Sequence, residues 1–225
     1  MVVVAAGKGT RLGGELPKQF LPVGGVPLLL RALRPFTSHP DVAHVVVVLA
    51  PPDAEHPPDF LADLMGESLT LAAGGPERSD SVAAGLKVLH EDCAVVLVHD
   101  GARPFVARAV IDSVIALARR GEGAVAAVPL SDTIKQAAGG DPTRVERTVP
   151  REGLWRAQTP QGFPRRLLAD AYARAAREGV HATDDASLVE ACGATVRLVP
   201  DSSRNLKVTT PDDLALAELL AASAG

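Results

Sequence analysis

The sequence of 225 residues contains only two cysteines, no long apolar run and no excess of positive charge. Cys93 and Cys192 stand in apolar surroundings without the spacing of metal ligands, which favours buried thiols in a reducing compartment. The formal net charge of -4 gives no electrostatic reason to expect a nucleic acid as a partner. No run is long enough to span a membrane, and no signal peptide precedes the first predicted strand. We therefore expect a soluble, cytoplasmic protein that binds neither nucleic acid nor membranes.

Apolar residues, by contrast, make up 47% of the chain, which suffices for a substantial core. Strand-like and helix-like patterns alternate along most of its length, and prolines bracket a loop at residues 51–58 before a short helix. Strands are predicted at residues 2–4, 42–49, 69–73, 94–98, 124–128 and 195–199, and helices at 27–36, 78–90, 106–120, 165–177, 184–191 and from 211 onward. This alternation predicts a single α/β domain over residues 1–225, with a Rossmann-like, mostly parallel sheet and helices on both faces.

The alternation is interrupted after residue 130. Residues 131–136 and 143–149 have polar faces and flank a turn-forming segment, GGDP at 139–142, so they predict a two-stranded hairpin. Such a hairpin is marginally stable alone in water, and it must therefore rest on its own domain or on a second subunit. We favour the second subunit, because the segment interrupts an otherwise complete α/β pattern. The prediction is a homodimer joined through a β-arm at about residues 130–153.

The first predicted strand leads directly into a glycine-rich segment. It has the sequence AAGKGTR at residues 5–11, and Lys18 follows soon after. Glycine has no Cβ, so backbone N–H groups around Gly7 and Gly9 can approach a ligand closely and point at an anion. Arg11 adds a planar fork of donors and Lys18 a compact charge, both suited to phosphate. The segment therefore predicts a phosphate-binding loop, and the alternative is a plain turn whose cations stay in water.

The spacing excludes two common phosphate-binding loops. A Walker loop requires Gly, four residues and then Gly-Lys-Ser/Thr, whereas here Lys8 stands between the two glycines. The dinucleotide-binding fingerprint requires a third glycine three residues after the second, and that position holds Leu12. Pro17 and Pro22 then favour an extended loop over a helix. A redox enzyme with a dinucleotide cofactor is therefore disfavoured.

Asp100 follows the predicted strand at residues 94–98 and is a candidate metal ligand. Ligands of parallel α/β sheets bind at the carboxyl ends of the strands, and Mg²⁺ prefers one or two carboxylates together with substrate phosphates. Arg103, three residues later, could hold a second anion. The alternatives are a helix cap for Asp100 and a surface ion pair for Arg103, while His99 suits the edge of the core better than the role of a base.

Other polar residues near the ends of predicted elements have no role that spacing alone assigns. The two glycines at residues 74–75 precede a helix and could bind a base edge or a phosphate through free N–H groups, but Ser81 could equally be an ordinary helix residue. Lys207 could reach the glycine-rich segment, whereas Thr183 suits a helix cap. Spacing leaves four residues of this kind open: Arg151, Thr159, Thr183 and Lys207.

Six motifs, in order along essentially the whole chain, resemble those of one enzyme family. They are AAGKGTR at residues 5–11, PKQ at 17–19, DGARP at 100–104, DT at 132–133, LWRAQTPQ at 154–161 and TDDAS at 183–187. The family is the 2-C-methyl-D-erythritol 4-phosphate cytidylyltransferases of non-mevalonate isoprenoid biosynthesis. The resemblance implies a nucleotidyltransferase fold and an enzyme that condenses CTP with 2-C-methyl-D-erythritol 4-phosphate, which gives 4-diphosphocytidyl-2-C-methyl-D-erythritol and pyrophosphate.

The resemblance also implies a nucleotide site. Its CTP contacts would be Ala5, Ala6, Gly7, Gly9, Arg11, Lys18, Gly75, Ser81, Asp100 and Lys207. Arg11 and Lys18 would stabilise the charge on the departing pyrophosphate, and the residues at 75 and 81 would fix the cytidine. Asp100 would bind Mg²⁺, or another divalent cation, shared with the α-phosphate that Lys207 also approaches. Two departures from the family pattern are Pro76, where an acidic residue is frequent, and Gly101, which replaces a common alanine.

For the sugar-alcohol phosphate, the resemblance implies contacts from Arg103, Thr159 and Thr183. Thr133 and Arg151 match substrate contacts on an arm that crosses to the other subunit of a homodimer. The catalytic residues would then be Arg11, Lys18, Arg151 and Lys207. The nearest alternative is a cytidylyltransferase acting on ribitol 5-phosphate, with the same fold and nucleotide loop. An alternative of another class is a non-catalytic, nucleotide-binding regulatory module.

Overall fold

The computed structural model describes residues 1–7, 16–66, 68–180 and 182–223. Its strands are β1 (Val2–Ala5), β2 (Pro22–Val23), β3 (Val26–Pro27), β4 (Val45–Leu49), β5 (Leu69–Ala73), β6 (Val95–Asp100), β7 (Gly123–Pro129), β8 (Ile134–Ala138), β9 (Asp141–Val149), β10 (Trp155–Pro164) and β11 (Val196–Pro200). Its helices are the 3-10 helix η1 (Lys18–Phe20) and the α-helices α1 (Leu28–Thr37), α2 (Pro51–Glu55), α3 (Asp59–Ala62), α4 (Arg78–Val88), α5 (Arg108–Arg119), α6 (Arg165–Glu178), α7 (Asp185–Ala191) and α8 (Pro211–Ala222).

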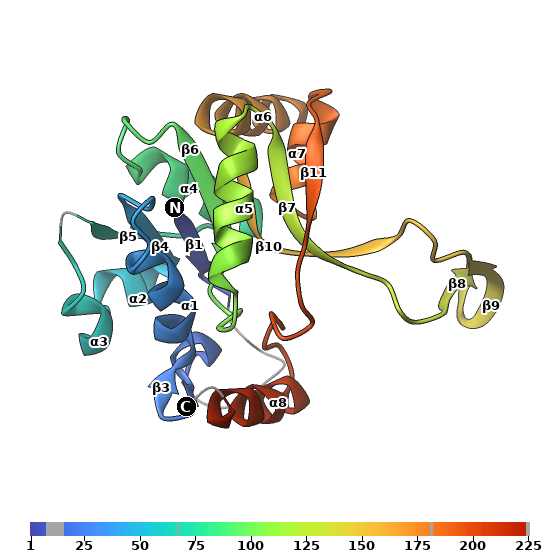
Figure 1. Ribbon diagram of the computed structural model, residues 1–225, viewed down its shortest axis with the longest axis horizontal. Helices are drawn as coiled ribbons and strands as arrows, with labels where there is room; N and C mark the ends of the chain where they lie inside the picture. The colour runs from blue at the N-terminus through green and yellow to red at the C-terminus, as the bar shows by residue number, and fades with distance from the viewer. Residues whose placement is uncertain (8–15, 67, 181, 224–225) are drawn as a thin grey trace.

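Seven strands form one central sheet in the order β11-β7-β10-β6-β1-β4-β5 (Figure 1). β1 pairs in parallel with β4 and β6, β4 pairs in parallel with β5, and β11 does so with β7. β10 runs antiparallel to both of its neighbours, β6 and β7. The predicted α/β class with a mostly parallel sheet is therefore confirmed.

Helices cover both faces of this sheet, because side chains alternate between the faces along each strand. Val3 of β1 packs in one buried cluster with residues of α1 and α5 such as Ile111. Val2, its neighbour in sequence, packs in a second cluster with residues of α4, α6 and α7 such as Val82 and Leu168. The continuous apolar runs of β1 and β4 are thus buried on both sides, as expected for strands inside a parallel sheet.

The structure differs from the sequence prediction in the middle of the sheet, where β10 occupies a stretch with no predicted strand. Pro160 and Pro164 lack an N–H donor, so the stretch does not have the pattern of a strand. The pairing between β10 and β7 shifts register between Ala157 and Gln161, and this irregularity accommodates Pro160. A Cβ on Gly162 would lie 2.4 Å from Val114 Cγ1, so glycine allows β10 to pass close to α5.

Two smaller predictions are also corrected. The expectation of buried thiols is wrong for Cys192, which is exposed at the end of α7, and Cys93 is only partly buried. The loop expected at residues 51–58 begins instead with α2, because Pro51 stands at a first-turn position that tolerates proline.

Among the described residues, no helix is both long and apolar enough to cross a membrane.

The polar hairpin is present and forms a separate two-stranded sheet of β8 and β9. Most of its residues are exposed. The hairpin is inserted between β7 and β10, which pair with each other directly at Pro129 and Trp155. Figure 1 shows the hairpin extending away from the central sheet. The protruding arm therefore exists as an element, and its use in dimerisation stays a prediction.

Candidate active site

A cavity of about 190 Å³ opens at the carboxyl edge of the central sheet, beside the ends of β1 and β6. Residues predicted to bind the nucleotide line it together: Ala5, Ala6, Gly7, Lys18, Gly75, Ser81, Asp100 and Lys207. Gly9 and Arg11 lie outside the described residues. These positions are far apart in sequence, and they meet because parallel strands deliver their carboxyl ends to the same edge of the sheet.

Small residues let the cavity walls approach one another. A Cβ on Gly74 would lie 2.6 Å from Ala6 Cβ and 2.7 Å from Ser81 Oγ, so glycine is required where this loop meets the first strand. At Gly101 a Cβ would lie 3.0 Å from Ala5 Cβ. The alanine expected there from the resemblance would therefore require a small local shift.

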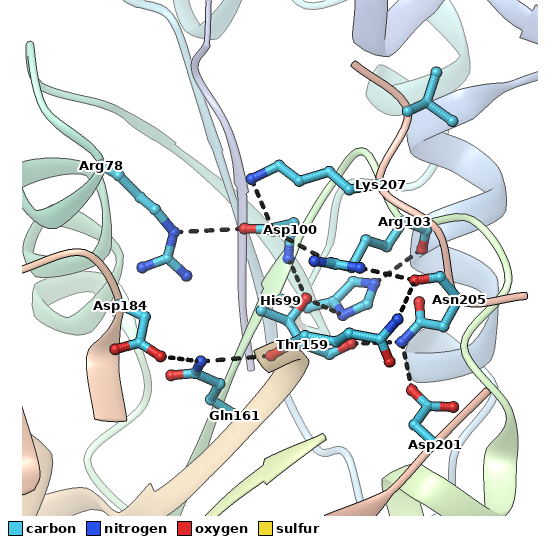
Figure 2. A network of polar contacts seen from close by, with 12 residues as sticks. Arg78, His99, Asp100, Arg103, Thr159, Gln161, Asp184, Asp201, Asn205 and Lys207 are labelled. Atoms are coloured by element: carbon cyan, nitrogen blue, oxygen red, sulfur yellow. Dashed lines mark hydrogen bonds and ion pairs between the residues drawn. The ribbon is translucent and has the colours of Figure 1, made fainter. Parts of the chain in front are cut away.

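The carboxylate of Asp100 is the centre of charge in the cavity (Figure 2). Lys207 Nζ lies 3.0 Å from Oδ2, Arg103 Nε lies 3.4 Å from the same oxygen, and Arg78 Nε lies 3.4 Å from Oδ1. Burial alone would raise the pKa of Asp100, but the three cations outweigh burial and hold that pKa well below its usual range. Asp100 is therefore ionised at neutral pH, inside a ring of positive charge.

Arg78 is a cavity residue that the motif spacing does not reveal. It begins α4, and its Nη2 donates to Asp185 Oδ2 at 2.8 Å while its Nε faces Asp100. Asp185 has a fully buried side chain and also accepts from Tyr172 OH at 2.5 Å. Burial alone would lower the pKa of Arg78, but the carboxylates of Asp185 and Asp100 outweigh it and raise the pKa. The sequence does show a cation at the start of a predicted helix, shortly after two glycines. It does not show that the partners of Arg78 are Asp100 and Asp185, because both lie far along the chain.

A buried chain of hydrogen bonds fixes the end of β6 behind Asp100. His99 is fully buried, and its Nε2 donates to Arg103 O at 3.0 Å, since a carbonyl only accepts. Its Nδ1 therefore carries no proton and accepts from Thr159 Oγ1 at 3.0 Å, while Thr159 Oγ1 accepts from Asp100 N–H at 3.0 Å. Burial lowers the pKa of His99 to about 4, so the ring is neutral at pH 7. His99 belongs to the core, as predicted.

The structure describes all the residues predicted to hold the sugar-alcohol phosphate, and none of them lines this cavity: Arg103, Thr133, Arg151, Thr159 and Thr183. Arg103 and Thr159 are buried behind Asp100. Thr183 is exposed just before α7. The alternative role of Thr183 as a helix cap is wrong, because Asp184 caps α7 by accepting from Ser187 N–H at 3.0 Å.

Thr133 and Arg151 are exposed at the base of the arm. Arg151 Nη1 donates to Ser131 O, which joins the two sides of the arm near its origin. Neither residue reaches the cavity of its own chain. Within one chain, the structure therefore brings together the described members of the predicted nucleotide contacts but not the predicted contacts on the arm.

The donor set of the cavity fits a divalent cation that protein and substrate hold jointly. Among the described residues, no group of three or more His, Cys, Asp or Glu side chains is placed to hold a metal ion. Mg²⁺ commonly uses one or two carboxylates and completes its coordination with water and substrate phosphates. Asp100 offers one ionised carboxylate on the wall of the cavity, which matches a Mg²⁺ site that is completed by water and substrate phosphates.

Known proteins match the chain over nearly its whole length. The family model described as IspD, 2-C-methyl-D-erythritol 4-phosphate cytidylyltransferase, matches residues 1–223. The 2-C-methyl-D-erythritol 4-phosphate cytidylyltransferase of Nitrosospira multiformis is 43% identical over 226 residues, which cover 97% of this chain and 95% of that protein. The bifunctional enzyme IspD/IspF of Rhodospirillum rubrum is 46% identical over 222 residues, which cover 97% of this chain but 56% of that protein. The chain thus spans little more than half of its bifunctional relatives.

Solved structures give the same result at the level of the fold. The crystal structure of 2-C-methyl-D-erythritol 4-phosphate cytidylyltransferase from Thermus thermophilus has a TM-score of 0.81 and 41% sequence identity, and the match covers 98% of each chain. A whole-chain family match and relatives above 40% identity agree with the cavity at the strand ends. The chain therefore belongs to the 2-C-methyl-D-erythritol 4-phosphate cytidylyltransferase family.

Proposed function

We propose that this chain transfers a cytidylyl group from CTP to 2-C-methyl-D-erythritol 4-phosphate, as an enzyme of non-mevalonate isoprenoid biosynthesis. The products are 4-diphosphocytidyl-2-C-methyl-D-erythritol and pyrophosphate. The observation that carries the proposal is the cavity at the sheet edge, where Lys18 and Lys207 meet the ionised Asp100 in a member of this family. The cavity is lined by three cations, Lys18, Arg78 and Lys207, and by two acidic residues, Glu77 and Asp100, and such a charged lining suits a triphosphate with a bound cation better than an uncharged ligand.

The reaction joins two anions, and the site must overcome their repulsion. An oxygen of the sugar-alcohol phosphate attacks the α-phosphorus of CTP, the bond from that phosphorus to the bridging oxygen breaks, and pyrophosphate leaves with the bonding electrons. Two like charges ~4 Å apart repel by roughly 4 kcal/mol at an effective dielectric constant near 20. Lys18, Lys207 and Arg11 offset this repulsion. The nucleophile is already ionised, so positioning and electrostatics suffice without a general base.

The nucleotide is held mainly by backbone groups in this proposal. N–H groups of the glycine-rich loop bind the phosphates, while Gly75, in the loop before α4, and Ser81, in the first turn of α4, bind the cytidine. Pro76 lines the cavity between them and has only a carbonyl to offer. Recognition of the cytosine ring at this position therefore falls to the backbone, because the acidic side chain frequent in the family is missing.

Mg²⁺, or another divalent cation, completes the proposed site. Asp100 would hold it together with the phosphates of CTP, and the ion would supply charge neutralisation at the α-phosphate. The ionised state of Asp100 at neutral pH supports this assignment, since only the carboxylate form binds a cation.

A homodimer is part of the proposal, with the arm of each subunit supplying Thr133 and Arg151 to the site of its partner. Support comes from the arm, which extends away from the central sheet (Figure 1), and from the position of both residues outside the lining of the cavity in their own chain. A hairpin with mostly exposed residues also gains stability when a second subunit covers it. We place the enzyme in the cytoplasm.

The test crosses four nucleoside triphosphates with two sugar-alcohol phosphates and measures pyrophosphate release in the presence of Mg²⁺. We expect turnover with CTP and 2-C-methyl-D-erythritol 4-phosphate, and little with any other pair. Turnover with ribitol 5-phosphate alone would reassign the substrate. Calorimetry that detects CTP binding, in a protein that turns over neither alcohol phosphate, would favour a regulatory module.

A further inference from the structure

Lys207 is carried into the cavity by a segment without regular secondary structure. This segment, residues 201–208, follows β11 and makes up most of the connection to α8. No helix or strand ladder holds its backbone, yet Lys207 Nζ lies 3.0 Å from Asp100 Oδ2. The position of that ammonium group must therefore depend on the individual hydrogen bonds that fasten the segment to the sheet.

Asn205 makes several of these bonds while only 1% of it is exposed. Its Nδ2 donates to Thr159 O at 2.8 Å and to Asp201 Oδ2 at 2.7 Å. Its main-chain O accepts from Arg103 Nη1 at 2.7 Å and from Gln158 Nε2 at 3.0 Å. One residue thus joins the segment to β10, to the loop after β6 and to its own beginning, as Figure 2 shows for the labelled residues.

A second attachment follows on the other side of Lys207. Val208 N–H donates to Ala102 O at 2.9 Å, beside the end of β6. Lys207 is therefore held between two fixed points, Asn205 and Val208. Buried hydrogen bonds exchange poorly with water, so breaking those at Asn205 leaves polar groups without partners and loosens this end of the segment.

We propose that Asn205 is a positioning residue of the cytidylyltransferase site, an inference that rests on the proposed function. It sets the ammonium group of Lys207 through segment 201–208. The bonds from Arg103 to the main-chain O of Asn205 and from Asn205 Nδ2 to Thr159 O fasten the segment to the loop after β6 and to β10. Asn205 does not itself line the cavity, and it acts through the groups that it holds.

The test is a double-mutant cycle between Asn205→Ala and Lys207→Ala, measured as kcat/KM for CTP at raised enzyme concentration. With Lys207 present, Asn205→Ala is expected to lower kcat/KM roughly ten- to hundredfold, because a small displacement of a catalytic group has effects of that size. With Lys207 already truncated, the same change is expected to cost about twofold or less. Equal losses with and without Lys207 would overturn the proposal.

Ser81→Ala provides the matched background. Ser81 also lines the cavity, but its hydroxyl donates to Glu77 O at the start of α4, far from segment 201–208 in sequence. In this background the loss caused by Asn205→Ala is expected to persist in full. A merely structural role of Asn205 would lower activity by one common factor in all backgrounds, in step with the folded fraction that circular dichroism measures at the assay temperature.

If Asn205→Ala does not fold, Gln158→Met takes its place in the double-mutant cycle, because it loosens the same segment from the β10 side. Methionine has a similar length but removes the Nε2 donor to Asn205 O and Ser202 O. We expect the same non-additivity with Lys207→Ala, and full additivity in a folded Gln158→Met variant would overturn the proposal. A wild-type protein that releases no pyrophosphate from CTP would instead refute the proposed function, so the two failures are distinct.

Discussion

At the scale of single residues, hydrogen bonds behind the cavity fix the end of β6, from which Asp100 faces the cavity. Thr159 Oγ1 accepts from Asp100 N–H and donates to His99 Nδ1, and both bonds are buried. Removing this hydroxyl leaves two buried polar groups without partners, and each such group costs roughly 1–3 kcal/mol. Thr159 thus supports the Asp100 carboxylate from outside the cavity.

We expect Thr159→Val, which keeps the shape of the side chain, to lower the free energy of unfolding by roughly 2–4 kcal/mol. Urea unfolding at pH 7 measures the change. Thr159→Ser is the control, because it keeps the hydroxyl and should recover most of the loss. If the valine variant were as stable as the wild type, the hydroxyl would not hold Asp100 and His99 as described.

His99 makes the stability of the fold depend on pH. Burial lowers its pKa to about 4 from the ordinary 6.5, so between these values the unfolded chain binds more protons than the folded one. The contribution of neutral His99 to the free energy of unfolding is therefore full above pH 6.5. It falls as the pH drops toward 4, by up to about 3 kcal/mol. We expect His99→Gln to lack this part of the pH dependence in urea unfolding. Equal slopes in the two proteins would mean that His99 is not held neutral.

Sequence patterns identify the residues that face the cavity better than those that support them. Lys18 stands in a motif and Asp100 at a strand end, whereas only the family resemblance assigns Lys207, and all three line the cavity. Arg78 and Asn205 are missed, because what matters is their partners, and only tertiary packing brings those close. An isolated Asn in an irregular segment has no periodicity and no motif that could indicate its burial.

At the scale of elements, the strength of the local pattern decides what the sequence predicts. β4 is a run of four valines and a leucine, and α5 repeats its apolar residues at helical spacing, so both are found within a few residues. β10 contains two prolines and a glycine, and its strand conformation comes from pairing with β6 and β7 on either side. Local propensity could not predict it, because tertiary contacts override propensity there.

The arm is inserted between two strands that pair directly with each other. β7 and β10 would form an ordinary antiparallel hairpin without it, since they already pair at Pro129 and Trp155. We expect a variant with residues 131–153 replaced by Asn-Gly to fold, because Asn-Gly favours two-residue hairpin turns. In size-exclusion chromatography it should be a monomer, and its pyrophosphate release should fall by roughly 100-fold or more. A folded, shortened chain that still forms a dimer would refute the role of the arm.

At the scale of the whole molecule, the proposed site is complete only when two subunits meet. Mixing inactive Lys18→Ala with inactive Arg151→Ala is therefore expected to restore pyrophosphate release. At random exchange, half of the dimers are mixed and each has one complete site, so about a quarter of wild-type activity should return. No recovery in dimers that demonstrably exchange subunits would place Arg151 in the site of its own chain.

The central claim is that the cations that line the cavity with Asp100 allow two phosphates to react there, and the kcat of Lys18→Ala tests it most directly. Lys87→Ala is the matched control, because Lys87 is exposed on α4 and does not line this cavity. We predict that Lys18→Ala folds normally and loses roughly 10²- to 10³-fold in kcat, whereas Lys87→Ala stays within about twofold of the wild type. Near-normal turnover by Lys18→Ala, or an equal loss in both variants, would contradict the account.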